Sequence, residues 1–108
     1  MDITIKLLPK VKSNLILEHD ADDDLLRGYI RAAADYAERY QKKPLNFYSK
    51  RGKHMPPTTE QAVVMLSSHF YESRDGSTGG FFADNTRAAE QVIKAIDRLL
   101  ALSKDWVV

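Results

Sequence analysis

The sequence predicts an all-α fold, a small bundle of three long helices plus a short N-terminal helix, in a single domain that spans residues 1–108. Three observations favour this fold. Apolar residues recur at three- and four-residue intervals in three separate segments. Each of these segments has a helix start signal, a helix stop signal or both at its ends. The length of 108 residues suits one domain with a modest core.

The first long helix is expected over residues 22–42. An acidic cluster precedes it, and aspartates there can accept the free backbone N–H groups of the first turn and oppose the positive end of the helix dipole. Pro44 ends it, because proline disfavours helical geometry at the preceding residue. The apolar face consists of Leu26, Tyr29, Ile30, Ala33, Ala37 and Tyr40.

The second long helix is expected over residues 58–73, after two consecutive prolines. Thr58 and Gln61 match a capping box, in which the two side chains satisfy free N–H groups of the first turn. The loop of residues 75–80, which contains three glycines, ends this helix. Its apolar face consists of Ala62, Val63, Leu66 and Phe70, with Met65 and His69.

The third long helix is expected over residues 86–103, with a capping residue among Asp84, Asn85 and Thr86. It has the cleanest apolar stripe in the sequence, which consists of Ala89, Val92, Ile93, Ile96, Leu99 and Leu100.

The remaining segments leave alternatives open. Residues 1–19 have a short apolar pattern that Pro9 interrupts, so we expect a short helix followed by an extended arm. Residues 43–57 alternate weakly between apolar and polar residues, and Gly52 could reverse the chain. That segment is therefore either a short β-hairpin or a mobile loop.

Charge is unevenly distributed along a chain that is nearly neutral overall, with 16 basic and 15 acidic residues. Residues 1–38 carry 8 acids and 5 bases, residues 39–57 carry 6 bases and no acid, and residues 58–108 carry 7 acids and 5 bases. A basic segment therefore lies between two mildly acidic ones.

Several classes of protein are excluded or disfavoured by composition. The chain has no cysteine, which excludes disulfides and thiolate metal sites and fits a reducing compartment. No apolar run is long enough to span a membrane, and residues 1–5 lack the layout of a signal peptide. We therefore expect a soluble cytoplasmic protein with no membrane contact.

No motif for catalysis, a metal or a cofactor is complete. An EF-hand that began at Asp20 would need glycine and glutamate where the chain has Leu25 and Arg31. His19, His54 and His69 lack the spacing of a helical zinc pair. The glycine loop is followed by Phe81 and Phe82 and not by the lysine of a phosphate-binding loop. We expect no enzyme and no cofactor.

Two features could instead contact partners. Phe81 and Phe82 either pack under the third helix or present an apolar contact to another protein. The segment of residues 42–54 combines cations with two aromatic side chains, which could contact nucleic acid. Since no known DNA-reading motif accompanies it, sequence-specific recognition is not expected.

The order of features resembles the small head-tail connector proteins of long-tailed double-stranded DNA phages, particularly those of HK-type lambdoid coliphages. The resemblance covers residues 14–102. It rests on the acidic run before residues 25–34, on Tyr36 and Tyr40, on residues 59–74 with their closing Tyr71-Glu72-x-Arg74, and on the final amphipathic helix. The chain differs from the family after this helix, where Trp106 follows in place of a prolyl-tyrosyl-arginine tail, so the C-terminal contacts stay open.

This resemblance implies a structural virion protein of the phage neck and no enzyme. It implies head completion after DNA packaging by an oligomeric ring of about twelve subunits, docked under the portal. The ring would extend the DNA channel, contact the DNA weakly and without specificity, and receive tail-completion or tail proteins. The alternative is a small cytoplasmic DNA-binding or regulatory protein that uses the basic 39–54 segment.

A ring needs two different surfaces that fit each other on neighbouring subunits. The candidate basic surface, facing a neighbour or the channel, consists of Lys42, Lys43, Lys50, Arg51 and Lys53. The candidate complementary acidic patch consists of Glu18, Asp20, Asp22, Asp23 and Asp24. We expect charge to set orientation and buried apolar area to supply affinity.

Overall fold

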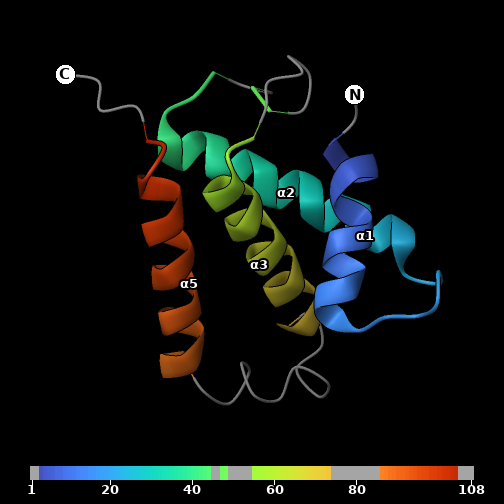
Figure 1. The fold of residues 1–108 in the computed structure, drawn as a ribbon. Coiled ribbons are helices and arrows are strands. Elements are labelled where there is room, and N and C mark those ends of the chain that lie inside the picture. The colour runs from blue at the N-terminus through green and yellow to red at the C-terminus, as the bar shows by residue number, and fades with distance from the viewer. Residues whose placement is uncertain (1–2, 45–46, 49–54, 74–85, 105–108) are drawn as a thin grey trace.

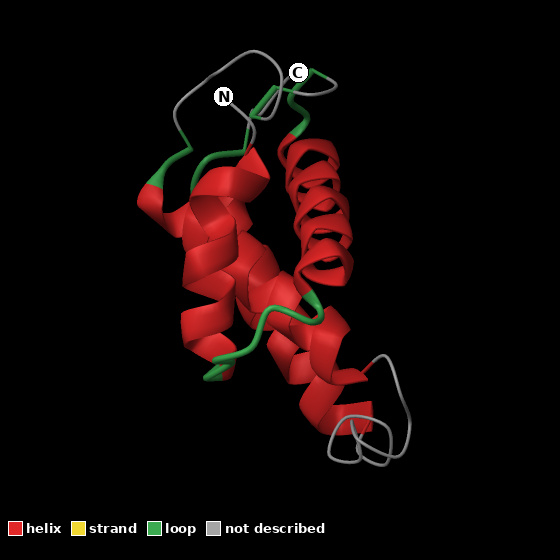
Figure 2. Ribbon diagram, turned by 90° about the vertical axis from the view of Figure 1, so that its right-hand side faces the viewer, coloured by secondary structure: helices red, strands yellow, loops and turns green. Residues whose placement is uncertain are grey.

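The computed structural model describes residues 3–44, 47–48, 55–73 and 86–104, and these residues form four α-helices and no strand (Figures 1 and 2). The helices are α1 (Ile3–Leu15), α2 (Asp23–Gln41), α3 (Pro57–Ser73) and α5 (Thr86–Ala101). The prediction of an all-α fold is confirmed, and a helix occupies each of the three long ranges expected from the sequence.

Helix α3 occupies the centre of the fold. It lies between α1 and α5, which do not pack against each other, and α2 crosses behind all three (Figure 1). Because α3 has neighbours on several sides, apolar residues surround most of it, and Val63, Val64 and Leu66 are all buried. This position explains why α3 is only weakly amphipathic compared with α2 and α5.

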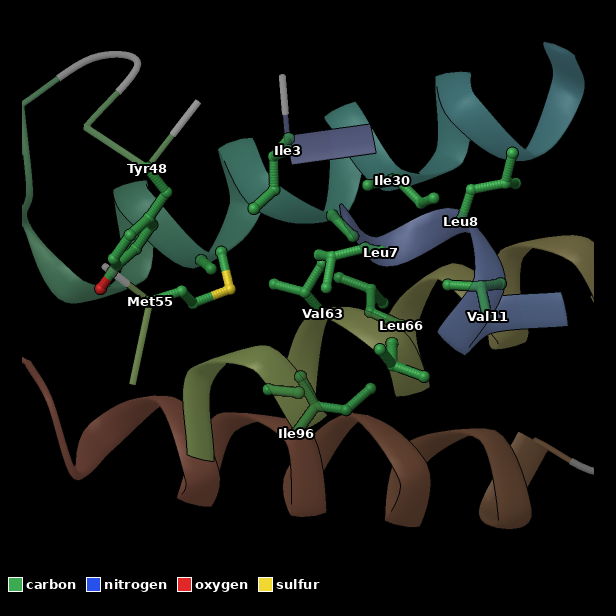
Figure 3. Packing of buried hydrophobic residues seen from close by; sticks show 14 of the residues in the cluster. Ile3, Leu7, Leu8, Val11, Ile30, Tyr48, Met55, Val63, Leu66 and Ile96 are labelled. Carbon is green, nitrogen blue, oxygen red and sulfur yellow. The ribbon is translucent and has the colours of Figure 1, made fainter. Parts of the chain in front are cut away.

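The buried apolar side chains form one cluster that fills the space between the helices (Figure 3). Leu7 and Val11 of α1 meet Leu26 and Ile30 of α2 in this core, and Ile96 and Leu100 close it from α5. Only these last two residues of the α5 stripe are fully buried. Its other members, Ala89, Val92, Ile93 and Leu99, are half-buried.

The N-terminal helix differs from the expected one, because α1 continues through Pro9 to Leu15. Proline lacks the N–H that would bond to the carbonyl of Ile5 and normally interrupts a helix. Here Pro9 is exposed, so water can reach that carbonyl, while Leu7, Leu8 and Val11 on the opposite face are buried. Burial of this face on both sides of Pro9 keeps the helix continuous.

The capping interactions at both ends of α2 differ from those predicted. Asp22 occupies the N-cap position without a side-chain cap, and its carboxylate accepts a hydrogen bond from the Tyr71 hydroxyl instead. At the other end the helix stops before Pro44. Lys42 adopts a left-handed conformation (φ 60°), and the Lys43 N–H bonds to the Glu38 carbonyl at 2.9 Å.

The start of α3 also corrects a prediction. The helix begins at Pro57, and the Glu60 N–H already bonds to the Pro56 carbonyl at 2.9 Å. Thr58 therefore lies inside the first turn and is not the cap. Proline suits this first position because its missing N–H has no partner in the helix there.

Three predictions lie wholly or largely outside the described residues. They concern the hairpin or loop between Lys43 and Pro57, the pair Phe81 and Phe82, and the tail that contains Trp106.

Candidate protein-protein interface

The acidic patch and the described part of the basic surface, Lys42 and Lys43, lie at opposite ends of α2 (Figure 1). The acidic patch is at the N-terminal end, on the side of α1. Lys42 and Lys43 follow the C-terminal end, on the side of α5. A helix of 19 residues is about 28 Å long, far more than the reach of a lysine side chain, so Lys42 and Lys43 cannot pair with the acidic patch of their own chain.

Lys12 of α1 organises the acidic patch from within. Its Nζ donates to the carboxylate of Asp20 and forms an ion pair with Asp23 at 2.9 Å. The hydrogen bonds to Asp20 and Asp23 raise the pKa of Lys12, and the one from Lys12 lowers the pKa of Asp20. Lys12 was absent from the sequence-based prediction, because eight and eleven residues separate it from these partners and nothing marks the contact in advance.

The other acids of the patch have partners too. Arg27 donates to Asp24 at 2.6 Å across one helical turn, and Tyr71 of α3 donates to Asp22. Glu18 is exposed. With Lys12 and Arg27 counted against five carboxylates, the patch keeps a net charge of −3. It therefore remains an acidic surface in a defined conformation.

The structure describes only the first two residues of the basic surface, Lys42 and Lys43. Lys42 is exposed, and the Lys43 Nζ lies 5.3 Å from the ring centroid of Phe47, a cation–π contact. Lys50, Arg51 and Lys53 lie outside the described residues. Their flanking residues, Tyr48 and Met55, are both buried at the C-terminal end of α2.

A buried hydrogen-bond network holds this end of the fold together, and its centre is Gln41, which is 0% exposed. The Gln41 Nε2 donates to the Thr59 Oγ1 at 2.8 Å and to the Leu100 carbonyl at 3.0 Å. Its Oε1 accepts from the Tyr48 hydroxyl at 2.6 Å. The network joins α2, α3, α5 and the start of the basic segment.

Glu38 extends this network by one turn of α2. Its carboxylate accepts the Tyr48 N–H at 2.9 Å, and its side chain is buried. Tyr48 is therefore held through both its backbone and its hydroxyl. The sequence-based prediction missed Glu38 and Gln41, since polar residues on a helix are ordinarily exposed and only the packing of α3 and α5 reveals that they are buried.

The end of α5 adds further residues beside the basic surface. Lys104 lies over the Tyr40 ring, with its Nζ 5.2 Å from the ring centroid. Leu102, two residues earlier, is an exposed apolar side chain. Arg39, the last basic residue of α2, donates to Asp35 at 2.8 Å. The basic surface thus includes a contribution from α5 that the charge distribution alone did not indicate.

A further group of charged side chains lies at a groove between α1 and α3. Pro9, Lys10, Pro57 and Glu60 are among its lining residues. Lys10 donates to Glu60, and the Lys6 Nζ lies 3.7 Å from the same carboxylate. Partial burial raises the pKa of Glu60, but the two lysines outweigh it, so the pKa is lowered overall. These ion pairs join α1 to α3.

The histidines do not form a site with other ligands. The His19 Nδ1 accepts the Ala21 N–H at 3.3 Å, and burial lowers the pKa of the half-buried His69. His54 lies outside the described residues. Within the described ranges, no group of three or more histidine, cysteine or acidic side chains could hold a metal ion, and no helix is long and apolar enough to cross a membrane.

Comparison with protein families identifies the family to which this chain belongs. The model of the phage gp6-like head-tail connector proteins matches residues 5–99. The chain belongs to the phage gp6-like head-tail connector family. No curated protein and no solved structure matches it. The match covers all four helices nearly completely, together with the acidic patch and the basic segment.

Membership in the gp6-like connector family confirms the resemblance found in the sequence. It supports a structural role in the phage neck, association with phage head and tail proteins, and the virion as the location of the chain. The proteins of this family are structural and not enzymatic.

Proposed function

We propose that this connector protein forms an oligomeric ring of about twelve subunits below the portal, extends the DNA channel and joins the packaged head to the tail. The observation that carries this proposal is the placement of opposite charges at opposite ends of α2, in a chain of the gp6-like connector family.

This placement supports ring formation. In each subunit Lys42 and Lys43 lie about 28 Å along α2 from the acidic patch, so these lysines cannot pair with the patch within one chain. A neighbouring subunit can supply the complement at each end. Repetition of such a contact between two different surfaces closes a ring when the rotation between subunits allows it.

The partners in the neck follow from this role. The portal and the tail-completion or tail proteins would meet the two faces of the ring, and DNA would pass through its centre. DNA that must slide needs only weak, non-specific contact with cations such as those of the basic segment.

Reversal of the basic segment tests the proposal. The triple variant Lys50→Glu, Arg51→Glu, Lys53→Glu should fold normally but assemble poorly, as measured by sedimentation velocity and native mass spectrometry. The variant Arg31→Glu, Lys94→Glu is the control, because both side chains are exposed on the helices away from these surfaces. Unchanged assembly of the triple variant would refute the role of the basic segment.

A second experiment tests the neck role itself. Phage that lacks this chain should produce DNA-filled heads and free tails that do not join, and added purified chain should restore joining. Normal joining without the chain would contradict the proposal. A monomer or dimer that binds DNA in a strongly salt-dependent way, with no larger species, would instead support the regulatory alternative.

A further inference from the structure

Exposed apolar side chains accompany the charges at both ends of α2. In the part of the chain that the structure describes, four large apolar residues are exposed: Ile5 (65%), Ile16 (84%), Leu25 (40%) and Leu102 (71%). Ile16 and Leu25 flank the acidic patch in the sequence, whereas Leu102 lies two residues after Leu100, whose carbonyl bonds to Gln41 at the end of α2. Ile5 lies on α1 and belongs to neither group.

Ile16 is exposed in a conformation that does not suit it. Its φ of 58° lies in the left-handed region, where a β-branched residue is strained and glycine or asparagine fits better. The turn itself is well made, since the Ile16 N–H bonds to the Ser13 carbonyl at 3.2 Å and the Leu17 N–H to the Lys12 carbonyl at 2.9 Å. Packing among the described residues does not explain the isoleucine, because most of its side chain is in solvent.

At the opposite end, Leu102 is exposed among cations. It follows α5, whose Leu100 carbonyl accepts a hydrogen bond from Gln41, and this bond fixes the end of α5 against the end of α2. Lys104 and Lys42 are the neighbouring cations of this surface. Each end of the molecule therefore combines one sign of charge with an exposed apolar side chain.

We propose that Ile16, with Leu25 and the acidic patch around it, docks on the Leu102 surface of a second copy of this chain. The occupant is a second copy because the two surfaces are opposite in charge, are both partly apolar and lie at opposite ends of one helix. This inference rests on the proposed ring and names its contact surfaces. Charge orients the two copies, and burial of Ile16 and Leu102 supplies the affinity.

Three single substitutions test this contact. Ile16→Asn relieves the strained backbone while it removes the apolar side chain, so the thermal stability of the monomer should be unchanged or higher while assembly weakens by about tenfold or more. Leu102→Gln should weaken assembly to a similar extent. Ile5→Asn is the control, because it makes the same substitution at another largely exposed isoleucine, on α1, and should leave assembly intact.

A mixing experiment then tests the head-to-tail arrangement. Each variant has one impaired end and one intact end. An equimolar mixture of Ile16→Asn and Leu102→Gln should therefore form heterodimers, whereas either variant alone should form no dimer. Sedimentation velocity and native mass spectrometry of the mixture would detect them. The mass spectrum separates the two chains because their masses differ.

The possible outcomes separate this inference from the function on which it rests. If the wild-type chain assembles and Ile16→Asn assembles equally well, the Ile16 contact is wrong and the ring stands. Loss of assembly in the Ile5→Asn control, or a mixture that yields no heterodimer, would also refute the contact. If wild-type chain forms no larger species alone and does not join heads to tails, both the ring and the contact fail.

Discussion

The two ends of α2 are stabilised by different interactions. Ion pairs at the surface organise the acidic end, with the half-buried Lys12 between Asp20 and Asp23 and with Arg27 on Asp24. At the basic end, Gln41 lies at the centre of a buried, hydrogen-bonded network. Exposed ion pairs contribute little and are screened by salt, whereas buried polar groups are costly to leave without partners.

This difference shows which end tolerates change. The acidic end can lose a charge with little effect on folding, so its charges are available for contact with a partner. The basic end depends on a buried hydrogen-bond network that holds Tyr48, which precedes Lys50 in the basic segment. Substitutions in this buried network should affect folding first and assembly second, whereas the exposed cations can be changed without loss of the network.

The largest effect is expected at Gln41. Its replacement in Gln41→Ala removes three hydrogen bonds and leaves the Tyr48 and Thr59 hydroxyls and the Leu100 carbonyl buried without this partner. The free energy of unfolding should fall by about 3 kcal/mol. Urea unfolding followed by circular dichroism measures this.

Gln61→Ala is the control for Gln41→Ala, because Gln61 is exposed on α3 and its loss should change stability by less than about 0.5 kcal/mol. Equal losses in the free energy of unfolding would show that the Gln41 network stabilises this end no more than an exposed glutamine does.

An intermediate effect is expected at Tyr36, which joins α2 to α5 by a hydrogen bond from its hydroxyl to the Asp97 carboxylate at 2.7 Å. Tyr36→Phe should lower the free energy of unfolding by about 1 kcal/mol. Burial and the contact with Asp97 raise the pKa of Tyr36 to about 12.

The raised pKa of Tyr36 makes a second measurement possible. The neutral hydroxyl is favoured in the folded state, so its contribution is complete below pH 10 and is lost as the pH rises through about 12. Spectrophotometric titration should show one late tyrosine that disappears in Tyr36→Phe. A titration identical to that of the wild type would contradict this assignment.

The smallest effect is expected at the acidic end. Lys12→Met should shift the urea midpoint only slightly, and high salt should diminish the shift, since Asp20 is exposed and water reaches both ion pairs in part. The pKa of Asp20 is lowered in the folded state, so the stabilisation is present above its ordinary pKa of 3.8 and is lost as the pH falls through the folded value.

Unfolding of the wild type and Lys12→Met at neutral pH and at acidic pH measures this loss. The difference between the two proteins should shrink at acidic pH. A difference that grows as the pH falls, or one as large as that of Gln41→Ala, would show that the two ends are not stabilised in the contrasting ways described above.

Sequence patterns predicted the helices better than their ends or their buried polar contacts. Periodicity located the helix of residues 22–42 because Leu26, Ile30 and Ala33 face the core. It failed at Pro9, where burial of the opposite face outweighs the local preference of proline. It also failed at Thr58, because Pro57 already begins the helix.

The candidate surfaces were also predicted only in part. Their signs and their positions along the chain could be predicted from counts of charge. The placement of the acidic patch and of Lys42 and Lys43 at opposite ends of α2 became known only from the structure of the helix between them. Lys12, Gln41 and Leu102 could not be predicted. Their roles depend on contacts between elements distant in the sequence or on exposure, which only the packed helices determine.

The most direct test of head-to-tail association between the two ends of α2 is a charge swap followed by sedimentation velocity. Reversal of the acidic end (Glu18→Lys, Asp20→Lys, Asp24→Lys) changes the net charge of the patch from −3 to +3, and reversal of the basic end (Lys42→Glu, Lys50→Glu, Arg51→Glu, Lys53→Glu) changes that of the basic surface from +5 to −3. Each reversal alone should weaken assembly. A chain that carries both reversals should assemble again, because its ends remain complementary. Assembly that the separate reversals leave unchanged, or that the combined reversals weaken further, would contradict association through these two ends.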